Sequence, residues 1–112
     1  MVDEKNIYEL SERIVREFQP ERIFLFGSYA CGTPPDGSDV DLLVILSFEG
    51  QSVQKAAEIL ETVDPRIPVD LIVRSPEQVR QRLMWNDFFL HEILKKGKVL
   101  YDRRFLKSAC GQ

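Results

Sequence analysis

The chain has few of the residues that hold small proteins together covalently or through metals. Only two cysteines occur among its 112 residues, Cys31 and Cys110, far apart in sequence and without metal-ligand spacing. We therefore expect free thiols in a reducing compartment and no zinc site. Long apolar runs are also missing, because the longest, 40–48, is far too short to cross a bilayer. The first residues are acidic where a signal peptide would be basic, so we expect a cytoplasmic protein.

Excess positive charge is absent as well. Asp and Glu number 18 against 15 Lys and Arg, which gives a net charge of −3. Proteins that bind nucleic acid on their own need a basic face to neutralise phosphates. Strong stand-alone nucleic-acid binding and a self-contained polymerase are therefore disfavoured. What the chain does have is 44% hydrophobic residues, enough to bury a core, and we expect a single domain over residues 1–112.

Helix-like and strand-like apolar spacing alternate in the first two thirds of the chain. Helical spacing is found over 3–18 and 51–63, and short continuous apolar runs typical of buried strands are found over 23–26, 40–46 and 67–73. The predicted order is therefore helix, strand, strand, helix, strand.

Boundary signals define the last third of the chain. Ser75 is suited to an N-cap, Pro76 to the first helical position and Gln78 to the third, which together predict the start of a helix. A second helix is expected over 87–96 and is ended by Gly97. Residues 99–101 predict either a short edge strand or packing of the tail, and the last ten residues give no clear signal.

Two short segments carry the residues that predict chemistry. Gly27 ends the first apolar run, so the chain can turn tightly and aim backbone N–H groups and the Ser28 hydroxyl into one small space. Such groups bind phosphate oxygens well. The glycines and prolines of 32–38 then predict an exposed loop before a strand that begins at Asp39. Because side chains alternate along a strand, Asp39 and Asp41 should project to the same side.

Carboxylates placed so closely need a cation. Like charges about 4 Å apart repel by about 4 kcal/mol at an effective dielectric of about 20. Oxygen ligands without His or Cys nearby favour Mg²⁺ or Mn²⁺. Asp70 interrupts the third apolar run, where an unpaired carboxylate is costly unless something compensates it. A shared metal site would supply that compensation, and the alternative is that Asp70 caps the preceding turn.

The combination resembles the minimal nucleotidyltransferases of the DNA polymerase β superfamily. Their pattern is glycine-serine, a short variable loop, Asp-x-Asp on the next strand and a third Asp on a later strand. The match here is close over 27–44 and looser over 67–73. It departs at Cys31, where the family's loop often carries a basic residue.

That resemblance implies a fold, a site and an activity. The fold is α+β, with a small mixed β-sheet flanked by helices. Gly27 and Ser28 would hold the triphosphate of ATP, and Asp39, Asp41 and Asp70 would be both catalytic residues and ligands of Mg²⁺ or Mn²⁺, with Asp70 also activating the acceptor hydroxyl. The activity is transfer of a nucleoside monophosphate, AMP from ATP, to a hydroxyl group.

The resemblance also implies a partner. Stand-alone members of this family commonly occur beside a helical protein of the HEPN type, an RNase toxin in many systems, and act as antitoxins by transferring AMP to it. The runner-up is a non-catalytic nucleotide-binding module that neutralises its partner by contact alone. The sequence leaves the oligomeric state open and allows a homo-oligomer.

Several other residues have an ordinary structural reading beside a functional one. Trp85, Phe88 and Phe89 form either core or interface, and a nucleobase platform is the less favoured reading. His91 has no identifiable catalytic partner, so a packed or surface histidine is expected. The lysines at 95, 96 and 98 suit a helix C-terminus without any function.

Overall fold

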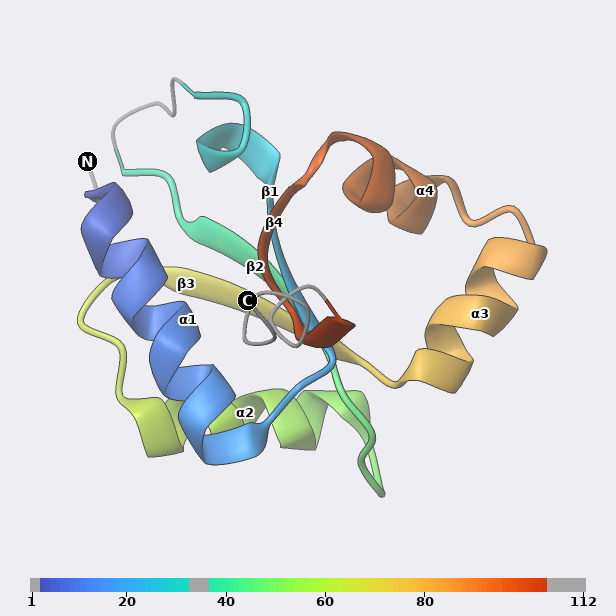
Figure 1. The fold of residues 1–112 in the computed structure, drawn as a ribbon, viewed down its shortest axis with the longest axis horizontal. Helices are drawn as coiled ribbons and strands as arrows, with labels where there is room; N and C mark the ends of the chain where they lie inside the picture. Colours follow the sequence, from blue (N-terminus) through green and yellow to red (C-terminus); the bar gives the residue numbers. More distant parts are fainter. Residues whose placement is uncertain (1–2, 33–36, 105–112) are drawn as a thin grey trace.

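A four-stranded sheet with helices on both faces makes up the part of the chain that the structure describes (Figure 1). The structure is a computed structural model, and it describes residues 3–32 and 37–104. In chain order the elements are α1 (Glu4–Phe18), β1 (Arg22–Phe26), the short 3₁₀ helix η1 (Gly27–Tyr29), β2 (Val40–Ile45), α2 (Ser52–Val63), β3 (Val69–Arg74), α3 (Pro76–Met84), α4 (Phe88–Lys96) and β4 (Lys98–Asp102). The predicted α+β class and the predicted element order are confirmed.

The sheet is mixed, as the family resemblance implies. Its strand order is β3-β2-β1-β4, with β1 antiparallel to both β2 and β4, and with β2 parallel to β3. A parallel pair needs a crossover connection, and α2 supplies it. The edge-strand reading of 99–101 is right, because β4 pairs with β1. The third strand begins at Val69 rather than at Ile67, since Pro68 has no N–H to donate to a ladder.

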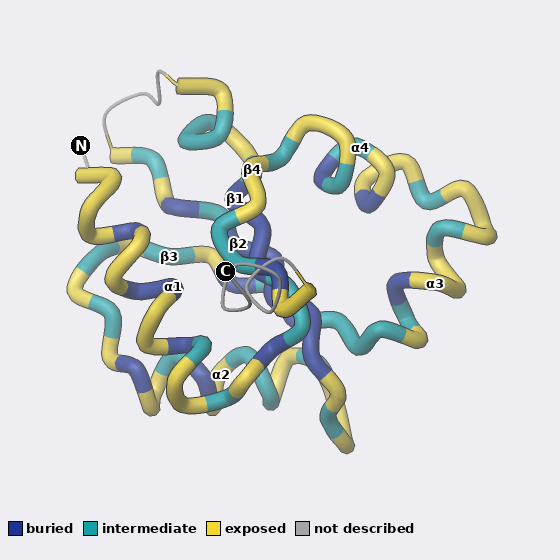
Figure 2. Tube along the Cα trace, in the orientation of Figure 1, coloured by how far each residue is buried: buried dark blue, intermediate teal, exposed yellow. Residues whose placement is uncertain are grey.

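Alternating side chains divide the core between the two faces of the sheet. The face that packs against α1 and α2 is formed by Ile23, Leu25, Val40, Leu42, Val44, Leu71 and Val73. The opposite face, which packs against α3 and α4, is formed by Phe24, Phe26, Leu43, Ile45 and Ile72. Figure 2 shows the buried sheet strands between these helices, whereas the corner joining α3 and α4 is largely exposed. Odd-numbered residues of β2 therefore belong to the α3–α4 face.

The helices of the last third begin where the sequence predicts. The Ser75 hydroxyl accepts a hydrogen bond from the Gln78 N–H at 3.1 Å, and the Gln78 side chain accepts one from the Ser75 N–H at 3.0 Å, which completes a capping box. Asp87 caps α4 rather than forming its first turn. Gly97 ends α4 with an extended backbone, φ −71°, and its lack of a side chain matters because a Cβ would press on the carbonyl oxygens of Ile93 and Leu25.

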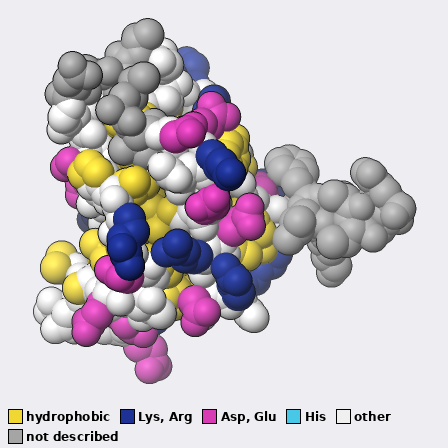
Figure 3. All heavy atoms as spheres, turned by 90° about the vertical axis from the view of Figure 1, so that its left-hand side faces the viewer, with side chains coloured by type: hydrophobic (Ala, Val, Ile, Leu, Met, Phe, Trp, Pro, Cys, Tyr) yellow, Lys and Arg dark blue, Asp and Glu magenta, His cyan; other side chains and the backbone are white. Residues whose placement is uncertain are grey.

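Side chains of both charge signs share the side of the molecule that carries α1. Figure 3 shows Lys and Arg interspersed with Asp and Glu on that face, with hydrophobic groups between them. Within residues 3–32 and 37–104, no helix is long and apolar enough to cross a membrane.

The end of β4 carries a buried carboxylate, that of Asp102, which is hydrogen-bonded to the residue two positions later. The Asp102 side chain accepts hydrogen bonds from the Arg104 N–H at 3.0 Å, Nε at 3.2 Å and Nη2 at 2.9 Å. The Arg104 guanidinium holds the pKa of Asp102 below its usual value, with further contributions from the Arg104 backbone N–H and from Arg22. The Arg103 N–H also donates to the Glu21 carbonyl at 2.9 Å.

Replacing Asp102 with Asn should lower the free energy of unfolding at neutral pH by about 1–2 kcal/mol, because hydrogen bonds to a charged acceptor are lost. The folded state favours ionised Asp102, so this contribution is present at neutral pH and disappears as the pH falls below 3.8 through the lowered pKa. Urea unfolding at pH 7 and at pH 3 measures both effects. Asp64→Asn is the control, since the interaction found for the Asp64 side chain among the described residues is an exposed pair with Arg66 at 3.7 Å. Equal losses in both variants would contradict the assignment.

Candidate active site

The phosphate-binding turn predicted from the sequence lies at the end of β1. Gly27 has a φ of 75°, in the left-handed region that favours glycine, and it opens η1. The Ala30 N–H donates to the Gly27 carbonyl at 3.1 Å, and the Cys31 N–H donates to the Ser28 carbonyl at 3.2 Å. A Cβ on Gly27 would collide with Oδ2 of Asp41. The turn therefore lies directly against Asp41, one of the three predicted catalytic carboxylates.

The three predicted acids come to one edge of the sheet. Asp41 is opposite Phe26 in the antiparallel pair β1–β2 and in register with Asp70 in the parallel pair β2–β3. Asp39 comes just before β2, so the strand starts one residue later than predicted. All three lie at positions that belong to the α3–α4 face. Asp41 is half-buried, whereas Asp39 and Asp70 are exposed. The structure thus places the three predicted acids near the same end of β2 and β3.

Electrostatic repulsion marks this edge. Burial raises the pKa of Asp41 above its ordinary value of 3.8, and the charges of Asp70 and then Asp39 raise it further. Within the described parts of the chain, none of the three carboxylates takes part in a salt bridge. Asp70 is therefore not explained by a neighbouring cation. A bound positive charge would remove the repulsion that the three carboxylates exert on one another.

The donor set suits a hard divalent cation, although the carboxylates are not gathered into a ready-made site. Among the described residues, no group of three His, Cys, Asp or Glu side chains lies close enough to hold a metal ion. Three carboxylates without nitrogen or sulfur ligands fit Mg²⁺ or Mn²⁺ and fit zinc poorly. Asp39, Asp41 and Asp70 are the residues that would hold such an ion.

A cavity of about 200 Å³ adjoins the turn, and the sequence reasoning missed it. It lies between η1 and α4 and is lined mainly by apolar groups, among them Phe26, Gly27, Ala30, Phe89 and Ile93. The rings of Phe26 and Phe89 meet edge to face, with centroids 5.6 Å apart. The sequence did contain one signal for this cavity. Phe26 is directly before Gly27, so its ring could be expected to border any ligand held at the turn.

The aromatic residues, the histidine and the cysteines singled out in the sequence differ in how far they are exposed. Trp85 and Phe88 are 70% and 76% exposed, so the reading as core is wrong for both, whereas Phe89 is 51% exposed and borders the cavity. His91 is exposed, and its Nε2 lies 3.3 Å from the Leu83 carbonyl oxygen, in agreement with a surface role. Cys31 is a free, exposed thiol, and Cys110 lies outside the described residues.

Replacing Gly27 with Ala should both strain the turn and displace Asp41. We expect a loss of about 2 kcal/mol or more in unfolding free energy, since a left-handed φ and a steric clash act together. The control is Gly50→Ala, where φ is also positive, 88°, but a Cβ meets only the end of the Gln54 side chain at 3.9 Å. Urea unfolding should show a smaller loss there. Adding Asp41→Ala to Gly27→Ala should recover part of the lost unfolding free energy. Strictly additive changes in the unfolding free energies of the two substitutions would contradict the proposed contact.

Comparison with known proteins finds relatives in sequence and in fold. A Methanocaldococcus jannaschii protein named "Putative protein adenylyltransferase" is 29% identical over 103 residues, which cover 90% of this chain and 100% of that protein. The solved structure of a Sulfolobus solfataricus protein, described as a "putative nucleotidyltransferase", has the same fold, with a TM-score of 0.63 at 22% identity over 89% of this chain and 80% of that chain.

A second solved structure, a toxin–antitoxin with AMP-PNP, has a TM-score of 0.52 at 23% identity over 96% of this chain and 80% of that chain. The family described as "Polymerase beta, Nucleotidyltransferase" matches residues 8–105. That match includes the turn at Gly27, all three aspartates and most of both helical layers. The chain therefore belongs to the polymerase β nucleotidyltransferase family.

Proposed function

We propose that this nucleotidyltransferase is Mg²⁺-dependent and transfers AMP from ATP to a hydroxyl group of a HEPN-type toxin, as an antitoxin of the type VII kind. The observation that carries the proposal is the convergence of the Gly27 turn with three carboxylates at one sheet edge. The name of the Methanocaldococcus jannaschii relative supports AMP as the transferred group. The toxin–antitoxin neighbour with AMP-PNP supports both a nucleotide and a toxin. The HEPN identity of the partner rests on the family resemblance.

Each group of the site has a separate role in the proposed reaction. Backbone N–H groups of η1 and the Ser28 hydroxyl hold phosphate oxygens, and the adjoining apolar cavity receives the nucleoside. The acceptor hydroxyl oxygen bonds to the α-phosphorus, the bond to the β-phosphate oxygen breaks, and pyrophosphate leaves. Asp70 takes the hydroxyl proton. Mg²⁺ bound by the carboxylates would stabilise the charge that develops on the phosphate oxygens.

The exposed aromatic corner between α3 and α4 is proposed to bind the partner. Met84, Trp85 and Phe88 are 81%, 70% and 76% exposed, and apolar side chains clustered in this way are typical of protein interfaces. The corner joins α3 to α4, which pack on the face of the sheet that also carries the three aspartates, so the partner and the site of transfer would share this face.

A non-catalytic module that neutralises its partner by contact is the second candidate. It is favoured by the absence, among the described residues, of a gathered metal site and by Cys31 in place of a basic residue. Turnover of ATP in the presence of the partner distinguishes the two functions.

Asp39→Asn and Asp41→Asn should each abolish AMP transfer, because each removes charge on which cation binding depends. The raised pKa of Asp41 means that its ionised form is disfavoured in the folded state. Its ionisation therefore lowers the free energy of unfolding as the pH rises above the pKa that Asp41 has in the unfolded chain. Asp41→Asn should therefore be as stable as the unchanged protein at pH 7, or more so. Calorimetry with ATP should show tighter binding with Mg²⁺ than with chelator. Equal affinities, or a large loss of stability in both variants, would contradict the metal site.

Trp85→Ala should weaken partner binding by about 2 kcal/mol or more, roughly thirtyfold, if Trp85 is an interface anchor. ATP affinity should stay unchanged, because Trp85 does not line the cavity at the turn. Val53→Ala is the control, since Val53 is 79% exposed on α2, which packs on the opposite face. Co-expression and titration with the partner give the affinities, and mass spectrometry detects AMP on the partner. A partner neutralised without modification would favour the second candidate.

A further inference from the structure

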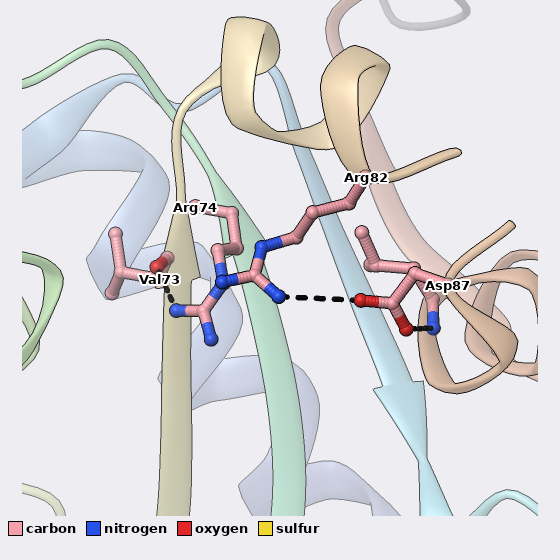
Figure 4. Close-up of polar contacts among 5 residues, drawn as sticks. Val73, Arg74, Arg82 and Asp87 are labelled. Atoms are coloured by element: carbon pink, nitrogen blue, oxygen red, sulfur yellow. Dashed lines mark hydrogen bonds and ion pairs between the residues drawn. The ribbon is translucent and has the colours of Figure 1, made fainter. Parts of the chain in front are cut away.

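Two arginines meet on the same face of the sheet as the three aspartates. Arg74 ends β3 in register with Ile45, and Ile45 belongs to the α3–α4 cluster. Asp70, Ile72 and Arg74 therefore alternate onto this one face. Arg82 reaches it from α3. The two guanidinium groups overlap in the view of Figure 4, and Arg82 is close enough for its charge to act on Arg74.

The arginine pair has more positive charge than its surroundings neutralise. Arg82 Nη1 lies 3.2 Å from Asp87 Oδ2, and the other oxygen of Asp87 already accepts the Leu90 N–H at 3.1 Å as the cap of α4. Arg74 Nη1 donates to the Val73 carbonyl oxygen at 2.8 Å, and no salt bridge to Arg74 is found among the described residues. One carboxylate, that of Asp87, thus faces two guanidinium groups and forms an ion pair with that of Arg82.

The surroundings make this excess charge costly. Arg74 is half-buried, and its burial lowers its pKa, with the charge of Arg82 lowering it further and that of Asp87 opposing the change. Two planar guanidinium groups with free donors match the paired oxygens of a phosphate or a carboxylate. An oxyanion here would relieve the repulsion between the arginines, as a cation would relieve that between the aspartates.

The position of the pair indicates which molecule carries the anion. Arg74 follows Asp70 by four residues along β3, about 13 Å between Cα atoms, whereas the Gly27 turn lies directly against Asp41. The triphosphate is accordingly held at the other end of the strands. Arg82 is three residues from Trp85, so the pair lies between the aspartates and the exposed corner proposed to bind the partner.

We propose that Arg74 and Arg82 form a binding site for an oxyanion, a phosphate or a carboxylate, on a part of the acceptor that lies away from its reacting hydroxyl. The assignment to the acceptor rests on the proposed transfer function. The existence of an oxyanion site does not, because anion binding can be measured without turnover.

The first experiment titrates the protein with inorganic phosphate in chelator and follows the arginine side-chain NMR signals. Arg74→Gln and Arg82→Gln should each weaken phosphate binding at least tenfold, and Arg74→Lys should recover only part of it because the planar fork is lost. Arg80→Gln is the matched control, an exposed arginine on the same helix, and should change nothing. Circular dichroism verifies that every variant is folded. Equal binding by Arg80→Gln and the Arg74 and Arg82 variants would overturn the site.

The second experiment assigns the source of the anion. With Mg²⁺-ATP, Arg74→Gln should leave the ATP Kd within twofold of the unchanged protein, while the KM for the acceptor rises at least tenfold. A tenfold loss of ATP affinity would overturn the acceptor assignment and place the nucleotide's own phosphates at the arginines. If no acceptor is modified at all, the proposed function fails, and the phosphate titration still decides whether the arginine pair binds an oxyanion.

Discussion

The close approach of Gly27 to Asp41 is the contact on which the site depends. The β1–β2 register places Asp41 beside Phe26, and the next residue must turn with a left-handed φ in space that a side chain would fill. Only glycine satisfies both conditions without strain. The same contact brings the turn proposed to bind phosphate close to Asp41, so one small residue would link the proposed nucleotide and metal parts of the site.

The two faces of the sheet are used differently. Helices α1 and α2 cover one face and form the larger buried cluster with it. On the other face, α3 and α4 form a smaller cluster and leave charged side chains at both ends of the strands. Acids gather at the start of β2 and β3, and arginines gather where β3 runs into α3. An incomplete layer of helices thus keeps a polar surface open on a well-packed sheet.

Negative charge is left uncompensated at one end of that surface, and positive charge is left uncompensated at the other. The pKa of Asp41 is raised and that of Arg74 is lowered, and like-charged neighbours contribute to both shifts. Such arrangements cost stability and are typical of sites that bind a counter-charge. A cation at the aspartates and an oxyanion at the arginines would each remove a repulsion that the isolated protein retains.

Local sequence determined the elements, because apolar periodicity, the Ser75 capping box and the glycine that ends β1 act within a few residues. Alternation along the predicted strand was enough to expect Asp39 and Asp41 on one side, although Asp39 comes just before β2. Other features were decided by tertiary structure. The β2–β3 register that pairs Asp41 with Asp70, the cavity between η1 and α4, the exposure of Trp85, and the meeting of Arg74 with Arg82 all join residues from different elements. Each depends on how the helices pack on the sheet, and spacing within one segment does not specify that.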